Sequence, residues 1–344
     1  MTDPSTDLPA QRARVEAYAR EHAADLGLDA AGALAAAHLG DGESYRAWAV
    51  GPADAGPGGA PPLVFRVVRR PPDELPRPMA EEFAALELVP EGVGPRGVLL
   101  DEDAAALGAP FMVESFVVGS VVPREEWTPA LLRTHAHQLA ALHSQTYETH
   151  GPITAPDGTG ALSMVANFAD AIGWWSANHP DITERDDVAR LVAKVRRAVE
   201  AAEPVFARAD TFSLVHADLV VPNILIGADG RPRYVDWEWA EIGDPARDLA
   251  YIGGRISASP WYVAMTDADV ERFTTEYAEA AGISGPGRLA DLRARRDAWE
   301  LFERLFSSLH WRMMTVRSAN PGSTPYPVAA QEMTQGLEAW PDPA

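Results

Sequence analysis

Hydrophobic residues recur with two kinds of spacing in the first 120 positions of this chain. Helical patterns cover about residues 9–26 and 79–89, whereas short apolar runs between glycines, prolines and charged residues predict strands. The predicted strands are a strand–turn–strand unit over 39–50, with glycines at 40 and 42, and single strands over 63–70 and 110–119. Residues 51–62, rich in glycine, proline and alanine, are expected to form a surface excursion between strands.

The pattern becomes helical after Trp127. Residues 130–145 place leucines at helical intervals, and no segment of the chain repeats another. We therefore expect an α+β fold with two lobes: a small sheet-rich lobe over residues 1–115 and a larger, mainly helical lobe over residues 116–344. A hinge near Glu114–Gly119 would join them. A chain of 344 residues is long enough for each lobe to have its own core.

Two strand-like runs flank the dipeptide Asp229–Gly230, which is a strong signal for a two-residue hairpin turn. In that register the two residue numbers of every cross-strand pair add up to the same value, so Asn223 lies opposite Asp236. Directly opposed side chains lie about 4.5–5.5 Å apart at Cβ and point to the same face. The other expected pairs are Ala228 with Arg231 and Ile226 with Arg233. A loop with an odd number of residues would break this pairing.

The polar residues of this segment have the chemistry that phosphoryl transfer requires. The amide of Asn223 and the carboxylate of Asp236 can share one Mg²⁺, which prefers oxygen ligands and completes its shell with phosphate and water. Asp218, on the loop that enters the hairpin, would be free to orient a substrate hydroxyl. Each residue alone is typical of a turn or a cap. Together, in one register, they indicate a kinase.

The segment HADLVVPNILI, with YVDWEWAEIGDPARDLA after it, resembles the aminoglycoside phosphotransferase and choline kinase family, the small-molecule relatives of protein kinases. Weaker similarity extends from about Leu39 to about Arg255. The resemblance implies a two-lobed protein-kinase-like fold, with a nucleotide-binding lobe followed by a catalytic and acceptor-binding lobe. It also implies ATP or GTP as co-substrate and Mg²⁺ as cofactor.

The resemblance further assigns roles to five residues. It implies that Asp218 is the catalytic base, that Asn223 and Asp236 are the metal ligands, and that His216 braces the catalytic loop. Asp248, in GDPARDLA, is similar to a structural aspartate that accepts backbone hydrogen bonds from that loop.

Two departures argue against a switched protein kinase. Position 217 is alanine, where protein kinases carry the arginine that reads a phosphorylated activation loop. Only eleven residues separate Asp236 from Asp248, which is too few for a long activation segment. A constitutively competent small-molecule kinase fits better.

The nucleotide is expected between the lobes. By the resemblance, backbone groups around Glu114 and Phe116 would pair with the base. Backbone N–H groups of the turn Gly40–Ser44 would approach the phosphates, although a Gly-x-Gly pair alone is weak evidence.

Kinases normally grip the phosphates with a strand lysine that pairs with a helix glutamate. The only lysine here, Lys194, lies in a distant helical segment, so an arginine must take this role. Arg66 is the best candidate, with Arg69 as the alternative, because a guanidinium can contact two phosphate oxygens. Its expected partner is Glu82, or else Glu81. A solvent-facing arginine on an edge strand is the competing interpretation for Arg66.

Composition limits the partners. The chain has a net charge of -21, which disfavours nucleic acid, since nucleic-acid binding relies on basic residues. No apolar run approaches the roughly 20 residues needed to cross a bilayer, and the N-terminal segment has no apolar signal core. Cysteine is absent, which excludes disulfides and thiolate metal sites. We expect a cytoplasmic protein of unspecified oligomeric state.

The identity of the acceptor is open at this point. An acidic surface favours a cationic, hydroxylated small molecule such as an aminoglycoside, although solubility also explains the charge. A macrolide, choline or a sugar metabolite is the alternative, and a non-catalytic nucleotide-binding module or a metal-dependent hydrolase is less favoured. Aromatic residues that could stack on an acceptor are Trp174, Trp175, Trp261, Tyr262 and Trp311, and an acidic cluster that could meet an amine is Asp267, Asp269 and Glu271.

Overall fold

The computed structural model describes residues 7–29, 32–53, 62–318 and 320–343. The chain divides into two units. The first comprises Met1–Val118 and Val235–Ala240, and the second comprises Gly119–Tyr234 and Glu241–Ala344. The roles predicted for residues 1–115 and 116–344 remain predictions. Most of the excursion predicted at 51–62 lies outside the described residues.

The first unit is built on an antiparallel five-stranded sheet in the order β1-β2-β3-β5-β4. Its strands are β1 (Leu34–Asp41), β2 (Tyr45–Pro52), β3 (Leu63–Val68), β4 (Gly97–Asp101) and β5 (Phe111–Ser115). All three predicted runs therefore form strands: the unit over 39–50 corresponds to β1 and β2, and the runs over 63–70 and 110–119 correspond to β3 and β5. The sequence pattern does not predict β4, because this edge strand is only partly buried and lacks a clear apolar alternation.

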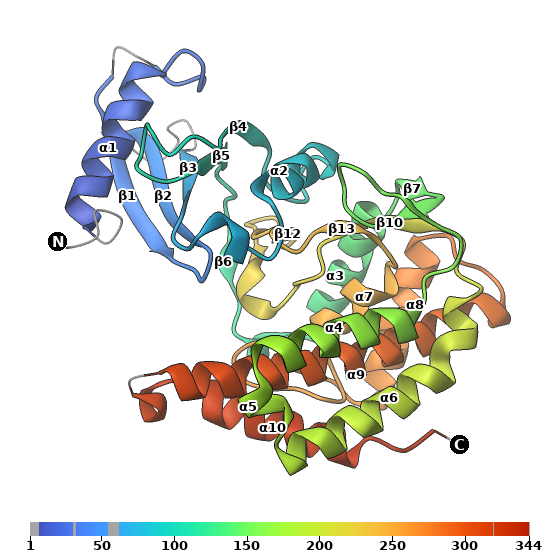
Figure 1. Cartoon of the computed structure of the whole chain (residues 1–344). Coiled ribbons are helices and arrows are strands. Elements are labelled where there is room, and N and C mark those ends of the chain that lie inside the picture. Colours follow the sequence, from blue (N-terminus) through green and yellow to red (C-terminus); the bar gives the residue numbers. More distant parts are fainter. Residues whose placement is uncertain (1–6, 30–31, 54–61, 319, 344) are drawn as a thin grey trace. The chain divides into compact units, whose positions relative to one another are not determined.

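The two faces of this sheet differ in chemistry. One face is apolar: Trp48, Phe65 and Phe111 pack with Val15 of helix α1 (Leu8–Glu21) in a single core. Figure 1 shows α1 lying along β1 and β2. The opposite face carries the buried Arg66, since side chains alternate between faces along a strand. Helix α2 (Met79–Leu88) supplies the partner of this arginine, as described below.

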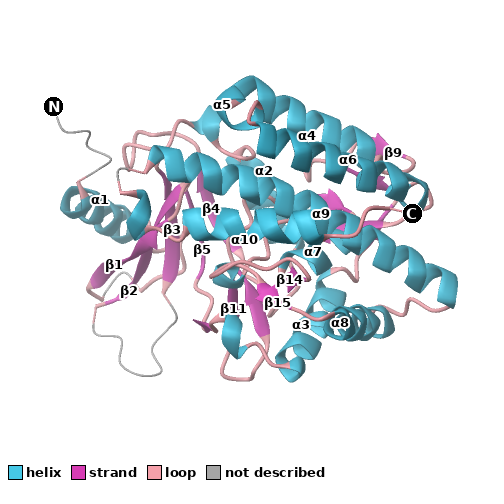
Figure 2. Ribbon diagram, turned by 90° about the horizontal axis from the view of Figure 1, so that it is seen from below, coloured by secondary structure: helices cyan, strands magenta, loops and turns pink. Residues whose placement is uncertain are grey.

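The second unit is mainly helical (Figure 2). Its helices are α3 (Pro129–Leu142), α4 (Met164–Asn178), α5 (Pro180–Thr183), α6 (Asp186–Phe206), α7 (Ala246–Tyr251), α8 (Asp267–Ala280), α9 (Pro286–Arg317) and α10 (Tyr326–Ala339). Helix α9 is the centre of this unit and packs against α6, α7 and α10. Helix α3 corresponds to the helix predicted over 130–145; the hydroxyl of Thr128 caps it by accepting a hydrogen bond from the Leu131 N–H.

Short strands complete the second unit. They are β6 (Ser120–Val121), β7 (Thr146–Tyr147), β8 (Thr149–His150), β9 (Gly158–Thr159), β10 (Phe212–Val215), β11 (Ile224–Ile226), β12 (Pro232–Tyr234), β13 (Glu241–Gly243), β14 (Gly253–Gly254) and β15 (Val263–Ala264). Single 3-10 turns lie at Pro72–Glu74 in the first unit and at Arg124–Glu126, Val221–Asn223 and Pro321–Ser323 in the second. The loop 216–223 thus runs between two small sheets, β13-β10-β7 and β12-β11-β6.

The predicted register of the β11–β12 hairpin is wrong. Ile226 pairs with Pro232 and Ile224 with Tyr234, one position away from the expected pairing, and a five-residue loop replaces the two-residue turn. The physical reason is the Asp229 side chain, which accepts a hydrogen bond from the Arg231 N–H at 3.2 Å and pairs with the Arg233 guanidinium. Only Gly230 in this loop has a positive φ, of 75°, whereas the predicted turn needs two such residues. The ladder therefore ends before Asn223 and Asp236.

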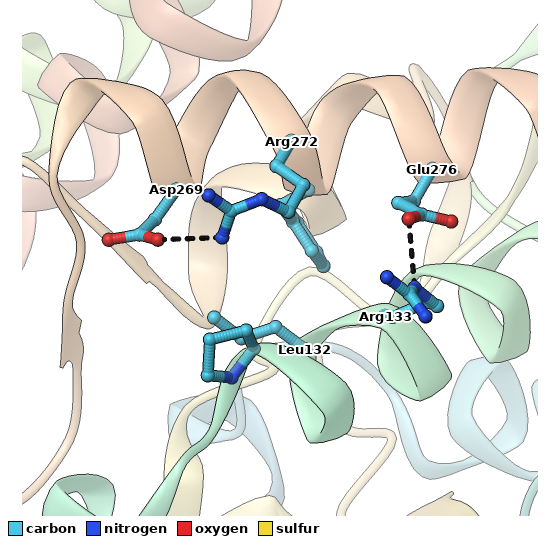
Figure 3. Close-up of a pocket in the computed structure, with 7 residues that line it drawn as sticks. Leu132, Arg133, Asp269, Arg272 and Glu276 are labelled. Atoms are coloured by element: carbon cyan, nitrogen blue, oxygen red, sulfur yellow. Dashed lines mark hydrogen bonds and ion pairs between the residues drawn. The ribbon is translucent and has the colours of Figure 1, made fainter.

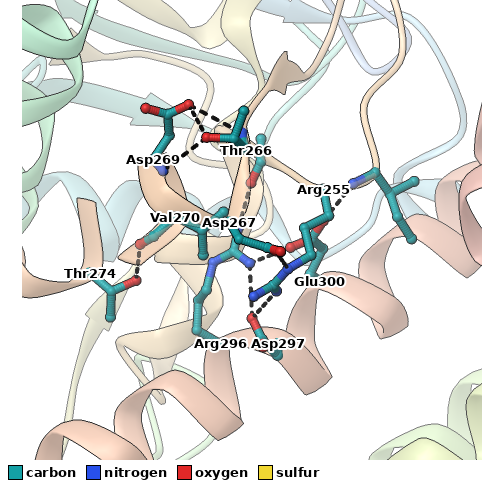
Figure 4. Close-up of polar contacts among 11 residues, drawn as sticks. Arg255, Thr266, Asp267, Asp269, Val270, Thr274, Arg296, Asp297 and Glu300 are labelled. Carbon is teal, nitrogen blue, oxygen red and sulfur yellow. Dashed lines mark hydrogen bonds and ion pairs between the residues drawn. The ribbon is translucent and has the colours of Figure 1, made fainter. Parts of the chain in front are cut away.

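Buried charges attach the segment after α7 to helix α9 (Figure 4). Arg296 is fully buried; it pairs with Glu300 and donates a hydrogen bond to the Gly253 carbonyl at 2.7 Å. Glu300 accepts a hydrogen bond from the Ile256 N–H at 2.8 Å. Arg255 adds an ion pair with Asp297 at 2.8 Å. Among the described residues, no helix is both long enough and apolar enough to span a membrane.

Gly254→Ala should lower the free energy of unfolding by about 3 kcal/mol, because a Cβ at this position would collide with the Glu300 carboxylate and disturb its buried ion pair. Thermal or urea unfolding measures the change. Gly173→Ala is the matched control, since the space around Gly173 on α4 is open and alanine is favoured over glycine within a helix. A Gly254→Ala variant as stable as wild type would contradict the prediction.

Candidate functional site

A strained turn begins the loop that carries the predicted catalytic residues. Ala217 has a φ of 60°, a region that residues other than glycine rarely adopt. The N–H groups of His216 and Ala217 both donate hydrogen bonds to the carboxylate of Asp248, each at 2.8 Å. The contact that the resemblance implied for Asp248 is therefore present. Two backbone donors on one carboxylate hold this turn in place against its strain.

Asp248 is fully buried and has further partners. His143 Nε2 lies 3.2 Å from Asp248 Oδ2, and His143 Nδ1 lies 2.9 Å from the Tyr277 hydroxyl. Burial raises the pKa of Asp248, but the His143 hydrogen bond, the nearby histidines and the His216 N–H outweigh it and leave the pKa below its ordinary value. His143 directly follows helix α3 in the chain. Its spacing to Asp248 in the chain gives no signal of this contact.

Asp218 and Asn223 contact each other directly. Asn223 Nδ2 donates to the Asp218 backbone carbonyl at 2.9 Å and to Asp218 Oδ2 at 3.0 Å. The loop between them is held from outside, since the Val221 N–H donates to the Trp261 carbonyl at 2.9 Å. The Asn223 amide nitrogen is thus committed to Asp218, which leaves its oxygen as the group for a metal. The ring of His216 is buried and lies edge-on to Tyr234, with centroids 6.4 Å apart.

A cluster of charged side chains surrounds Arg66 in the first unit. One guanidinium nitrogen, Nη1, pairs with Glu82 and the other, Nη2, pairs with Asp236. Glu114 lies 4.0 Å from Nη1, and the guanidinium lies over the Tyr45 ring, 4.3 Å from its centroid. We call these five residues the Arg66 cluster. The predicted pairing of Arg66 with Glu82 is present, and the interpretation of Arg66 as a solvent-facing residue on an edge strand is wrong.

The Arg66 cluster carries an excess of negative charge. Burial raises the pKa of Glu82 and that of Glu114 to about 7, Arg66 opposes this, and the charge of Asp236 adds to it. Glu238, two residues after Asp236, belongs to the same electrostatic environment: burial and then the charges of Asp236 and Glu82 raise its pKa to about 8. Sequence reasoning missed Glu238, although the pattern Asp-x-Glu was a visible signal. Like Ala217, Asp236 has a positive φ, of 70°.

The other residues predicted to bind nucleotide make contacts within the first unit. Ser44 is buried directly before β2, and its carbonyl accepts a hydrogen bond from the Arg69 N–H at 2.9 Å. The side chain of Arg69, the alternative to Arg66, lies 3.5 Å from Asp41. The Glu114 backbone has strand partners on both sides, and the Phe116 N–H donates to the Pro62 carbonyl at 3.1 Å. Some of these backbone N–H and C=O groups therefore already make hydrogen bonds within the first unit.

The two predicted metal ligands belong to different units, Asn223 to the second and Asp236 to the first. Among the residues that the structure describes, no three His, Asp or Glu side chains gather to form a metal site. The Asn223 side-chain oxygen and the Asp236 carboxylate are each hard oxygen donors of the kind that magnesium prefers. Asp236 is partly exposed, with 38% of its side chain accessible.

The predicted acceptor residues are largely occupied by structural contacts. Trp175, Tyr262 and Trp311 are buried, and Trp261 stacks on Trp311 at 4.4 Å between centroids. Asp269 makes a capping box with Thr266 at the start of α8, and Asp267 and Glu271 pair with Arg255 and Arg293. Only Trp174 of the five predicted aromatic residues is largely exposed, at 56%.

A small recess lies between α3 and α8 (Figure 3), and Asp269 is the one predicted acceptor residue among the residues that line it. Its charged side chains pair with one another: Arg133 with Glu276 at 2.8 Å and Arg272 with Asp269 at 3.1 Å. Because these charges are already compensated, the recess is not a candidate for the acceptor site.

Comparisons with known proteins find a matching family model and several solved structures with similar folds. A family model described as the phosphotransferase enzyme family (APH) matches residues 35–292. The sequence matches no curated protein. Three solved structures have similar folds: an ethanolamine kinase of Plasmodium vivax (13% identity, 93% of this chain and 87% of that chain covered, TM-score 0.64), the aminoglycoside phosphotransferase APH(4)-Ia in complex with ADP and hygromycin B (19%, 94% and 97%, 0.60) and a choline kinase of Cryptosporidium parvum (12%, 94% and 94%, 0.58). Because the sequence identities are low, these likenesses show the fold alone. The fold is kinase-like, with a sheet-rich first unit and a mainly helical second unit.

Proposed function

Since the chain belongs to the phosphotransferase enzyme family and has the fold of small-molecule kinases, we propose that it transfers the γ-phosphate of ATP or GTP to a hydroxyl group of an aminoglycoside-like antibiotic. The observation that carries the proposal is the loop 216–223. A buried aspartate holds its strained turn, and Asn223 holds Asp218. A catalytic base must be held in a fixed position, and these contacts hold Asp218 in this way.

In this proposal each residue has one task. Asp218 orients the acceptor hydroxyl and takes its proton as the new bond to phosphorus forms. Arg66 binds phosphate oxygens through its planar fork, held by Glu82. Asn223 and Asp236 would hold magnesium, which when bound offsets the negative charge on the β- and γ-phosphates. No covalent enzyme intermediate is needed, so catalysis rests on position and electrostatics.

Several features support a cationic acceptor. The net charge of -21 raises the local concentration of cations. The similarly folded APH(4)-Ia was crystallised with ADP and hygromycin B, which points to adenine nucleotide as the donor and to an aminoglycoside as the first acceptor to test. The likeness to choline and ethanolamine kinases makes small amino alcohols the second class to test.

The test is a thermal-shift experiment with ATP or GTP, each with and without magnesium, followed by a panel of aminoglycosides, macrolides, choline, ethanolamine and sugars. Saturating magnesium-nucleotide should raise Tm by roughly 2–5 °C, because a ligand that binds only the folded state stabilises it. Transfer is then measured as acceptor-dependent ADP or GDP release.

The Asp236→Ala variant should lose the magnesium-dependent part of the shift. Asp291→Asn, a partly exposed aspartate that pairs with Arg208, is the control and should respond like wild type. A wild-type protein whose Tm does not change with any magnesium-nucleotide would contradict the proposal, and a shift without transfer to any acceptor would indicate a nucleotide-binding module.

A further inference from the structure

We propose that Glu114 is a positioning residue that adapts the phosphate-binding site to an arginine in place of a lysine. This inference rests on the proposed function, because it assigns Arg66 to the nucleotide phosphates. The single lysine of the chain, Lys194, lies in helix α6 of the second unit and 128 positions after Arg66.

The sheet register places Arg66, Tyr45 and Glu114 on the same face of the five-stranded sheet. Arg66 pairs with Met112 on β5 and with Ala47 on β2, and Glu114 and Tyr45 each lie two residues along from those partners. Residues two apart on a strand share a face, and such diagonal neighbours are within reach of long side chains. Tyr45 and Glu114 therefore flank Arg66 from its two neighbouring strands.

This arrangement matches a guanidinium and not an ammonium. The two nitrogens of Arg66 reach two different carboxylates, those of Glu82 and Asp236, and its flat face lies over the Tyr45 ring. A lysine has a single nitrogen that is strongly hydrated, whereas a guanidinium is weakly hydrated and stacks on aromatic rings. Since Arg66 is only 6% exposed, the site removes most of the water that an ammonium would keep.

Glu114 supplies a third carboxylate to this buried cation. Its side chain is buried, and its Oε2 atom has no hydrogen-bond partner among the described residues, so Arg66 at 4.0 Å is the cation that compensates it. The attraction holds the Nη1 side of the fork in place. If the cation is changed to a shorter one with a single nitrogen, Glu114 becomes a buried carboxylate without adequate compensation, which is costly.

A double-mutant cycle of Arg66→Lys and Glu114→Gln tests the inference through the KM for magnesium-nucleotide. We expect Arg66→Lys to raise this KM by about 100-fold and Glu114→Gln by about 5-fold. The double variant should have a KM about 10-fold lower than that of Arg66→Lys alone, because the uncompensated carboxylate is gone. The KM for the acceptor should stay within about two-fold of wild type in all three.

The matched control is the surface pair of the exposed Arg208 and the partly exposed Asp291, changed to lysine and asparagine, which should leave every parameter unchanged. Provided that the wild-type protein transfers phosphate, either of two results would overturn the inference. One is additive effects in the cycle, and the other is a Glu114→Gln variant with the wild-type KM for nucleotide. If Arg66→Lys does not fold, the Glu114→Gln result alone decides. A wild-type protein that binds no magnesium-nucleotide would instead contradict the proposed function.

Discussion

Asp218→Asn should lower kcat by about 10³-fold, because the amide cannot accept the proton of the acceptor hydroxyl. The KM for magnesium-nucleotide should change by less than about three-fold, since in the proposed function Asp218 contacts the acceptor and not the phosphates. The variant should fold normally: asparagine keeps an oxygen that can accept the hydrogen bond from Asn223 Nδ2, now 3.0 Å from Asp218 Oδ2. Steady-state kinetics on the acceptor identified by the panel measures both constants.

Asp229→Asn is the matched control for this prediction. Asp229 is an exposed aspartate in the neighbouring hairpin loop, where it pairs with Arg233 at 3.1 Å. Its replacement should leave kcat within about two-fold of wild type. An Asp218→Asn enzyme that keeps more than about a tenth of the wild-type kcat would show that Asp218 is not the base.

Asp248→Asn is expected to affect both stability and activity. An asparagine can accept hydrogen bonds through one atom only, so an N–H group of His216 or Ala217 would face another donor in a buried site. We expect a loss of about 3 kcal/mol in the free energy of unfolding, which corresponds to a fall in Tm of roughly 5–10 °C. Because the strained turn at Ala217 would relax, kcat should also fall by about 10- to 100-fold at a temperature where the variant is folded.

The pH dependence of stability provides an independent check on Asp248. Its pKa is lower in the folded protein than in the unfolded chain, so its contribution is fully present above the unfolded pKa, near 3.9. The contribution is lost as the pH falls through the lower, folded pKa. Asp248→Asn should therefore remove part of the stability change of wild type below about pH 4. Asp267→Asn, at an exposed position, is the control. Equal acid sensitivity in wild type and Asp248→Asn would contradict this account.

Local spacing accounts for the elements that were predicted. The apolar run at 63–70 is β3, the pattern at 79–89 is α2, and the helical spacing at 130–145 is α3. The helix expected over 9–26 ends earlier, at Glu21. Strand β4 went unpredicted because a partly buried edge strand carries little periodic signal.

The hairpin shows where local reasoning fails. The dipeptide Asp229–Gly230 correctly marks a turn, but the Asp229 carboxylate binds the Arg231 N–H and the Arg233 side chain, and the turn opens into a five-residue loop. A shift of one residue changes every cross-strand pair. The argument that Asn223 and Asp236 face each other across the ladder is therefore wrong, although their proposed roles as metal ligands do not depend on that ladder.

The sequence by itself determined the family and the order of the chemical groups Asp218, Asn223, Asp236 and Asp248 along the chain. It also indicated that Arg66 and Glu82 would pair. Only the tertiary structure decided that Glu114 and Tyr45 complete the surroundings of Arg66, and that His143 supports Asp248. The physical reason is distance along the chain: Arg66 and Asp236 are 170 positions apart, and His143 and Asp248 are 105 apart. Contacts of this kind depend on how strands and helices pack, which local spacing does not encode.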